Sequence, residues 1–267
     1  MKIGQYNRLT VKRFVDFGLY LTDDEGNEVL LPARYIDGDP VVGDQIDVFV
    51  YTDSEDRPVA TTDHPYATVG EVAFLQVAEV SRIGAFLDWG LPKDLLVPFK
   101  EQRATMRRGG LYPVYVYLDH ASGRVVGSAK IEKFLGNTLP RYKCGQAVKA
   151  LVLQHTEIGY KAVVDNMFMG MIYDSAVYSP LTIGQTVTAY IGRVRPDGKI
   201  DLTLSSRNEI DPIADRIMEY VASPERSLPV DDNMSPEAVK ELFGCSKRLY
   251  KQALGALYKS GRLSKKQ

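Results

Sequence analysis

Three short stretches of the chain share one pattern: Val15-Asp-Phe-Gly-Leu-Tyr-Leu21, Ser81-Arg-Ile-Gly-Ala-Phe-Leu87 and Thr156-Glu-Ile-Gly-Tyr-Lys-Ala-Val-Val164. In each stretch a glycine divides two short apolar runs. A valine stands seven residues before each glycine, and a second glycine follows twenty-five residues after it. These landmarks are Val11, Gly18 and Gly43, then Val77, Gly84 and Gly109, then Val152, Gly159 and Gly184. Landmarks that recur in register three times indicate an internal repeat.

Each second glycine opens a stretch in which apolar residues alternate with other residues, the period of a half-buried strand. An aromatic residue falls at the same interleaved place in each copy: Phe49, Tyr115 and Tyr190. Turn signals such as Pro196-Asp197-Gly198 separate the short runs. About five strands in so small a unit close most economically as a barrel, and the glycine after the first run fits a bulge or a tight bend. We therefore predict a mainly β chain of three tandem five-stranded OB-fold barrels, at residues 1–65, 66–135 and 144–208.

Phe17-Gly18-Leu19-Tyr20 and Ile83-Gly84-Ala85-Phe86 resemble the Phe-Gly-Ala-Phe signature of the ribosomal S-one type of OB-fold domain. The third repeat carries Gly170-Met171-Ile172-Tyr173-Asp174-Ser175 where that family has Gly-Leu-Val-His-x-Ser. The resemblance implies an RNA-binding face formed by two aromatics, a histidine and a basic residue of the last strand. Carried over residue by residue, it marks the following positions: Phe17, Tyr20 and Arg57 in the first repeat, Phe86 and Arg124 in the second, and Tyr173 and Lys199 in the third.

The repeats depart from that signature in ways that bear on function. Pro32 and Pro98 occupy the histidine position, and Ile83 replaces the leading aromatic of the second repeat. Ile158 and Lys161 stand where the third repeat would have its aromatics. We therefore expect several weak sites rather than one strong site. The alternative is that Phe17, Tyr20 and Phe86 pack the barrel or an interface between repeats. We expect Trp89 to fill the core or a domain interface.

The last segment, residues 210–267, changes to helical spacing. Asp211 and Pro212 predict the start of a helix that reaches Ala222, Ser235 caps a second helix that ends near Gly244, and Ser246 caps a third. Two helices joined by a short glycine-containing turn predict a helix-turn-helix or winged-helix module, with a wing that is short or continues beyond Gln267. Its last part is basic and contains Lys247, Arg248, Lys251, Lys259, Arg262, Lys265 and Lys266. Among these we predict RNA contacts at Lys247, Arg248 and Lys251.

Gly244-Cys245-Ser246-Lys247 and Ala253-Leu254-Gly255-Ala256-Leu257-Tyr258 resemble the C-terminal motif of the bacterial conserved virulence factor B family. Three S-one-like repeats followed by a winged helix are also similar to that family's domain order. The resemblance covers essentially the whole chain. It implies an RNA-binding, regulatory protein.

Composition bounds the possible functions. The formal net charge is −1 over 267 residues, so attraction to nucleic acid has to come from local patches. His64, His120 and His155 share no metal-ligand spacing, and neither a nucleophile elbow nor a phosphate-binding glycine loop occurs. We expect no catalytic residue, no metal and no cofactor. Without a signal peptide or a long apolar stretch, we also expect a cytoplasmic protein that does not bind membranes.

Three functional hypotheses follow. The first is non-catalytic binding of single-stranded RNA over several weak sites, in post-transcriptional regulation. The second is an adaptor that docks on ribosome or RNA polymerase components after losing most RNA contacts, which the missing histidines and the neutral charge favour. The third is duplex DNA binding by the terminal module, which the missing wing disfavours.

Overall fold

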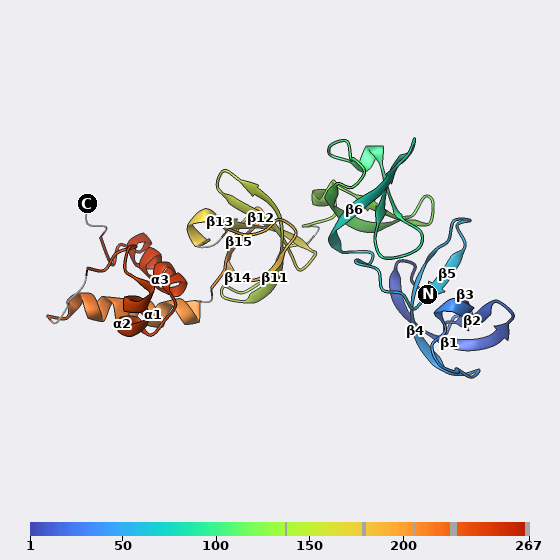
Figure 1. Ribbon diagram of the computed structural model, residues 1–267, viewed down its shortest axis with the longest axis horizontal. Coiled ribbons are helices and arrows are strands. Elements are labelled where there is room, and N and C mark those ends of the chain that lie inside the picture. The colour runs from blue at the N-terminus through green and yellow to red at the C-terminus, as the bar shows by residue number, and fades with distance from the viewer. Residues whose placement is uncertain (137, 178–179, 206, 225–228, 265–267) are drawn as a thin grey trace. The chain divides into compact units, whose positions relative to one another are not determined.

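The structure is a computed structural model that describes residues 1–136, 138–177, 180–205, 207–224 and 229–264, without the side chains of residues 207–209. It divides into two compact units, Met1–Phe134 and Leu135–Gln267. The first unit holds two closed five-stranded barrels. The second holds a third barrel and three helices (Figure 1). The predicted fold class is confirmed.

The three barrels share one strand order. Barrel 1 consists of β1 (Gln5–Val15), β2 (Gly18–Thr22), β3 (Glu28–Pro32), β4 (Gln45–Thr52) and β5 (Pro58–Thr61). Barrel 2 consists of β6 (Val72–Val80), β7 (Gly84–Asp88), β8 (Leu95–Pro98), β9 (Leu111–Asp119) and β10 (Arg124–Ser128). Barrel 3 consists of β11 (Ala147–Thr156), β12 (Gly159–Val164), β13 (Phe168–Tyr173), β14 (Thr186–Val194) and β15 (Ile200–Thr203).

In each barrel the first three strands form antiparallel neighbours, and the third strand pairs in parallel with the fifth. A 3₁₀ turn follows the third strand of each: η1 (Ala33–Tyr35), η2 (Phe99–Glu101) and η4 (Asp174–Ala176). A further turn, η3 (Ile131–Lys133), ends the chain of barrel 2. The alternating residues point inward as the sequence predicts, and Val48, Val114 and Ala189 are fully buried.

The bulge of the first strand and the repeated glycine lie at different positions and have different roles. The bulge of the first strand lies just after the repeated valine, where the register shifts between Val11 and Arg13, with equivalent shifts in the other two barrels. The glycine instead begins the second strand, close to a neighbouring backbone. A Cβ built on Gly18 would lie 2.2 Å from the carbonyl oxygen of Leu31. Of the two roles expected for this glycine, the tight bend is therefore the correct one.

Barrels 1 and 2 share a hydrophobic core. Phe49 and Tyr51 on the outer face of β4 pack against Trp89, with ring centroids 5.8 and 6.5 Å apart. The indole nitrogen of Trp89 donates a hydrogen bond to the Lys93 carbonyl at 2.6 Å. Trp89 is 2% exposed. The prediction that Trp89 fills the core or a domain interface is confirmed, and it does so at the junction of the two barrels.

The helices of the second unit are α1 (Arg207–Ala222), α2 (Pro236–Phe243) and α3 (Lys247–Lys259). The Ser235 and Ser246 side chains cap α2 and α3, and Gly244 ends α2 in the left-handed conformation at φ 62°, as predicted. The predicted start of α1 is wrong. The helix begins five residues before Pro212, which lies inside it and gives up one backbone hydrogen bond near the helix start.

The third helix is tied to the end of barrel 3. Arg248 donates to the Leu204 carbonyl at 3.2 Å, and the Ser205 hydroxyl bonds to the buried Gln252 amide oxygen. From the end of α3 to Ser264 the described residues form no strand, so they contain no wing. Within the described ranges, no helix is long and apolar enough to cross a membrane.

Candidate nucleic-acid interface

Barrel 1 brings two of its predicted aromatics to one exposed surface. Tyr20 lies on β2, and Phe17 lies in the turn just before that strand with 58% of its surface exposed. The guanidinium carbon of Arg13 lies 3.7 Å from the centroid of the Tyr20 ring. This cation–π contact holds the ring beside a positive charge.

Arg13 was missed by the sequence analysis, and the bulge explains why. Regular antiparallel pairing from Val11 and Leu21 would place Lys12 opposite Tyr20. The bulge shifts the register by one residue, so Arg13 takes that place. Phe14, the following residue, is 53% exposed although it pairs with the buried Leu19. The two consecutive basic residues Lys12 and Arg13 just before the first glycine were the available signal.

Arg57 completes this surface at the turn before β5. Its guanidinium donates to Asp53 at 2.8 and 3.0 Å and lies 3.0 Å from Glu55. The hydrogen bond with Asp53 and the negative charges of Asp53 and Glu55 raise the pKa of Arg57. The side chain remains 67% exposed, and exposed ion pairs contribute little stability, so a phosphate can compete for this guanidinium. We call Arg13, Phe17, Tyr20 and Arg57 the barrel 1 face.

Barrel 2 brings Phe86 and Arg124 together, but in a different electrostatic setting. Both line a cavity of about 400 Å³. Arg124 forms an ion pair with Asp56, which belongs to the turn before β5 in barrel 1. The hydrogen bond that Arg124 donates to Asp56 raises the pKa of Arg124. The structure thus places this predicted phosphate contact in the junction between the two barrels.

In barrel 3 the two predicted RNA-binding residues, Tyr173 and Lys199, contact different partners and not each other. The Tyr173 hydroxyl lies 3.3 Å from Asp201 and accepts a hydrogen bond from Arg195, which also donates to Asp201 at 2.8 Å. Lys199 pairs with Asp197 at 3.0 Å. Over the described residues, no hydrogen bond or ion pair joins Tyr173 to Lys199. The position of Tyr20 and Phe86 is held here by Lys161, so this face lacks their stacking ring.

The predicted basic residues of α3 lie at its first two turns. Lys247 begins the helix, Arg248 contacts barrel 3, and Lys251 is half-buried and already has an interaction partner. Lys259 is exposed, and Arg262 pairs with Asp215 at 3.0 Å. Lys265 and Lys266 lie outside the described residues. The end of α3 that would enter a DNA groove is therefore partly occupied by barrel 3.

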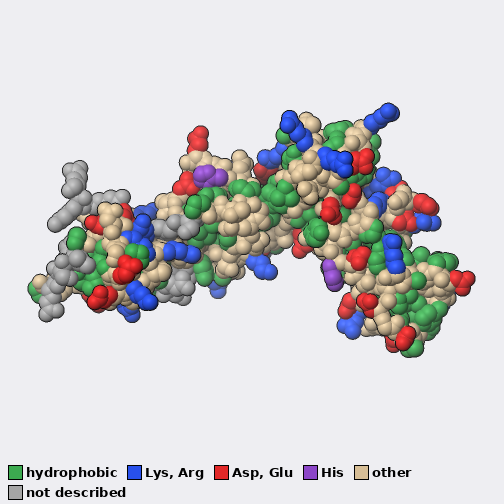
Figure 2. Space-filling model, in the orientation of Figure 1, with side chains coloured by type: hydrophobic (Ala, Val, Ile, Leu, Met, Phe, Trp, Pro, Cys, Tyr) green, Lys and Arg blue, Asp and Glu red, His purple; other side chains and the backbone are tan. Residues whose placement is uncertain are grey.

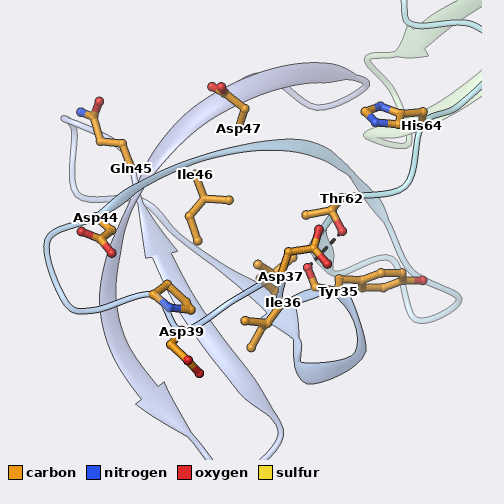
Figure 3. A pocket seen from close by; sticks show the side chains of 12 residues that line it. Tyr35, Ile36, Asp37, Asp39, Asp44, Gln45, Ile46, Asp47, Thr62 and His64 are labelled. Atoms are coloured by element: carbon orange, nitrogen blue, oxygen red, sulfur yellow. Dashed lines mark hydrogen bonds between the residues drawn. The ribbon is translucent and has the colours of Figure 1, made fainter.

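Another groove on barrel 1, of about 600 Å³, has the opposite charge (Figure 3). Its rim carries Asp37, Asp39, Asp44 and Asp47, and on its floor the Thr62 hydroxyl donates to the Tyr35 carbonyl at 3.0 Å. Four carboxylates repel phosphate, so this groove is not an RNA candidate. Figure 2 shows basic and acidic side chains interspersed over the visible face. The described residues hold no cluster of His, Cys, Asp and Glu side chains suited to a metal ion.

Comparisons with known proteins agree with this architecture. The S1 domain family matches residues 3–63 and 69–129, and the CvfB-like winged helix domain matches residues 215–267. The chain is 27% identical to the uncharacterized protein YitL of Bacillus subtilis (strain 168) over 98% of this chain and 91% of that protein. It is 24% identical to conserved virulence factor B of Staphylococcus aureus (strain USA300), over 82% of this chain and 76% of that protein.

A crystal structure of a multidomain protein with nucleic acid binding domains from Streptococcus pneumoniae TIGR4 matches over 99% of this chain and 96% of that one. The sequence identity is 24% and the TM-score 0.43.

Barrel fold, strand order and family matches define the chain as a tandem S1-domain protein with a C-terminal winged helix domain. In domain order and in sequence it is similar to the conserved virulence factor B proteins. S1 and winged helix domains are binding domains and not enzyme families, and the S1 domains support a nucleic-acid-binding role.

Proposed function

We propose that this protein is a non-catalytic binder of single-stranded RNA that acts in the cytoplasm in post-transcriptional regulation, with the barrel 1 face as its principal site. The observation that carries the proposal is the cation–π contact between Arg13 and Tyr20, on the hairpin whose turn exposes Phe17, with Arg57 nearby. Exposed rings can stack unpaired bases, each contributing about 1–3 kcal/mol, while guanidinium groups contact the phosphates.

The other predicted residues then have supporting roles. Phe86 and Arg124 in barrel 2, and Tyr173 and Lys199 in barrel 3, would add weak contacts whose effects combine because the domains are linked. Lys247, Arg248 and Lys251 would contact RNA phosphates only in part, because α3 already contacts barrel 3. The contact between Arg248 and barrel 3 also disfavours the hypothesis that α3 binds duplex DNA.

The adaptor hypothesis remains the second candidate. The acidic groove of barrel 1 and the exposed Val41 and Val42, each 60% exposed, favour a protein partner with a basic, partly apolar surface. Components of the ribosome or of RNA polymerase would fit that description. In this case the chain would show no salt-sensitive binding of RNA.

The test is fluorescence anisotropy of a labelled twelve-nucleotide RNA titrated with the full chain at two salt concentrations. The Phe17→Ala/Tyr20→Ala/Arg57→Ala variant should bind at least about tenfold more weakly, because two stacking rings and one phosphate contact are lost. The comparison variant, Ile158→Ala/Lys161→Ala/Lys199→Ala, changes the same register positions of barrel 3. It should lose no more than about threefold, because among the proposed contacts only the weak one of Lys199 is removed.

The outcomes separate the hypotheses. Binding that weakens with salt and with the barrel 1 variant supports the proposal. An equal or larger loss in the barrel 3 variant would move the site to barrel 3. A complete lack of binding at low salt would overturn the RNA proposal and favour the adaptor.

A further inference from the structure

Barrels 1 and 2 place opposite charges beside equivalent rings. In barrel 1 the residue paired with Tyr20 across the β1–β2 ladder is Arg13. In barrel 2 the residue paired with Phe86 across the β6–β7 ladder is Glu79. A phosphate is attracted to the first ring and repelled from the second. The two faces therefore suit different parts of a nucleotide.

The cavity of barrel 2 has an apolar floor and a charged rim. Phe86, Leu96 and Val126 lie side by side on paired strands and line it, together with Ile83. Asp56, Glu79, Lys93, Asp94 and Arg124 form the rim. A volume of about 400 Å³ beside a half-buried ring suits one planar aromatic group.

The rim cations are already neutralised by barrel 1. Asp56 forms an ion pair with Arg124, and its carboxylate lies 3.7 Å from the Lys93 ammonium, which also donates to the Asp53 carbonyl. Asp56 holds a left-handed conformation at φ 63°, which few residues other than glycine adopt. The turn before β5 thus closes one side of the cavity and removes its attraction for phosphate.

The carboxylates of Glu79 and Asp94 remain without partners. Within the described part of the chain, neither accepts a hydrogen bond nor forms an ion pair. Burial and the nearby charges of Asp88 and Glu79 raise the pKa of Asp94. Carboxylates at the mouth of an apolar cavity are suited to accept hydrogen bonds from N–H groups of a ligand.

We propose that this cavity binds one unstacked base that carries an exocyclic amino group, and that it disfavours uracil. The inference rests on the proposed RNA binding and adds base selection to it. The base stacks on Phe86, and its amino group donates to Glu79 or Asp94. Carboxylates accept from the cytosine amino group, whereas uracil presents a carbonyl oxygen at the same place and is repelled. Barrel 1 then holds the RNA backbone while barrel 2 reads a base.

Cytosine and uracil give the sharpest test, because they have the same size and differ at that position. Labelled rC12 and rU12 are titrated with the full chain, with the Glu79→Gln/Asp94→Asn variant and with Asp37→Asn/Asp39→Asn. The last variant removes two exposed carboxylates from the acidic groove and serves as the matched control. The wild type and the control should prefer rC12 by at least about fivefold. The Glu79→Gln/Asp94→Asn variant should bind the two RNAs within about twofold of each other, because amides donate as well as accept.

Each result decides the inference. Equal binding of rC12 and rU12 by the wild type would overturn base selection while leaving the proposed RNA binding intact. A preference that survives in the Glu79→Gln/Asp94→Asn variant would also overturn it, because another group would then read the base. A lack of binding of both RNAs would overturn the proposed function together with the inference. Thermal unfolding of each variant checks that the barrel stays folded.

Discussion

The glycine that opens the second strand of each barrel is required by its surroundings. Gly18, Gly84 and Gly159 lie against the backbone of the third strand, and a Cβ on any of them would lie 2.2–2.3 Å from a carbonyl oxygen. That oxygen belongs to a paired strand and cannot move without disturbing the ladder. The spacing of these glycines in the sequence therefore reflects closure of the barrel.

The substitution Gly84→Ala should destabilise the protein by at least about 2 kcal/mol, because its Cβ would meet the Val97 carbonyl. The control is Gly26→Ala. Gly26 also has a positive φ, 85°, but no atom lies within 4 Å of its added Cβ, so about 1 kcal/mol is expected. Urea unfolding measures both free energies. Equal losses would mean that backbone conformation alone requires glycine at position 84.

On a larger scale, the fourth strand of each barrel carries an outward aromatic at the same register position. Phe49 packs against Trp89 of the following barrel, and Tyr115 stacks on Phe134 with centroids 4.4 Å apart. Tyr190 lines a groove together with Ala256 of α3. Phe49 and Tyr115 thus contact residues that follow their own strand in the chain, and Tyr190 lines a groove beside α3. The repeated aromatic recognised in the sequence therefore serves contacts within the chain.

A second group of elements is joined by one carboxylate. Glu101 at the end of η2 accepts hydrogen bonds from the Ser128 hydroxyl of β10 at 2.6 Å and from the Lys133 ammonium of η3 at 3.0 Å. Burial alone would raise the pKa of Glu101, but these hydrogen bonds and the positive charges of Lys133 and Lys130 lower it below its ordinary value. The ionised form is thus the one that holds barrel 2 together.

The substitution Glu101→Gln should cost about 1–3 kcal/mol at pH 7, because it removes hydrogen bonds to a charged group. A depressed pKa stabilises the folded state above the unfolded-state pKa, and the gain is lost as the pH falls through the folded-state pKa. The difference between wild type and variant should therefore shrink below about pH 4. Urea unfolding from pH 7 to pH 3 tests this. A difference independent of pH would show that the charge of Glu101 contributes nothing.

For the first unit as a whole, barrels 1 and 2 behave as one structural body because they share a core. Phe49 is fully buried, and its ring lies 5.4 Å from Tyr6 and 5.8 Å from Trp89. The Asp56–Arg124 ion pair crosses the same junction. The barrel 1 face and the cavity of barrel 2 thus belong to one compact unit, and under the proposed function one RNA strand would meet both.

The substitution Phe49→Ala should therefore destabilise the first unit by about 3–5 kcal/mol, because it empties the shared core. The exposed Phe14 provides the control, since Phe14→Ala should change the stability by no more than about 0.5 kcal/mol. Fluorescence of Trp89, the chain's only tryptophan, follows urea unfolding from within the junction. If Phe49→Ala proved as mild as Phe14→Ala, the two barrels would not depend on this contact.

Much of the fold was predictable, because repeated glycines and alternating residues are local signals. The bulge was harder to place, and its one-residue shift put Arg13 rather than Lys12 beside Tyr20. The pairing of Arg124 with Asp56 could not be predicted, because the two residues come from different repeats and meet only through domain packing. The start of α1 was predicted five residues late because Pro212 resembles a first helical residue.

The most direct test of the central claim locates the bound RNA on the protein. A single-stranded RNA that contains 4-thiouridine is bound to the full chain and crosslinked by light, and mass spectrometry identifies the modified residues. The barrel 1 face predicts crosslinks at Phe17 or Tyr20, which disappear when excess unlabelled RNA competes. Crosslinks confined to barrel 3 or to residues 207–264 would contradict the account.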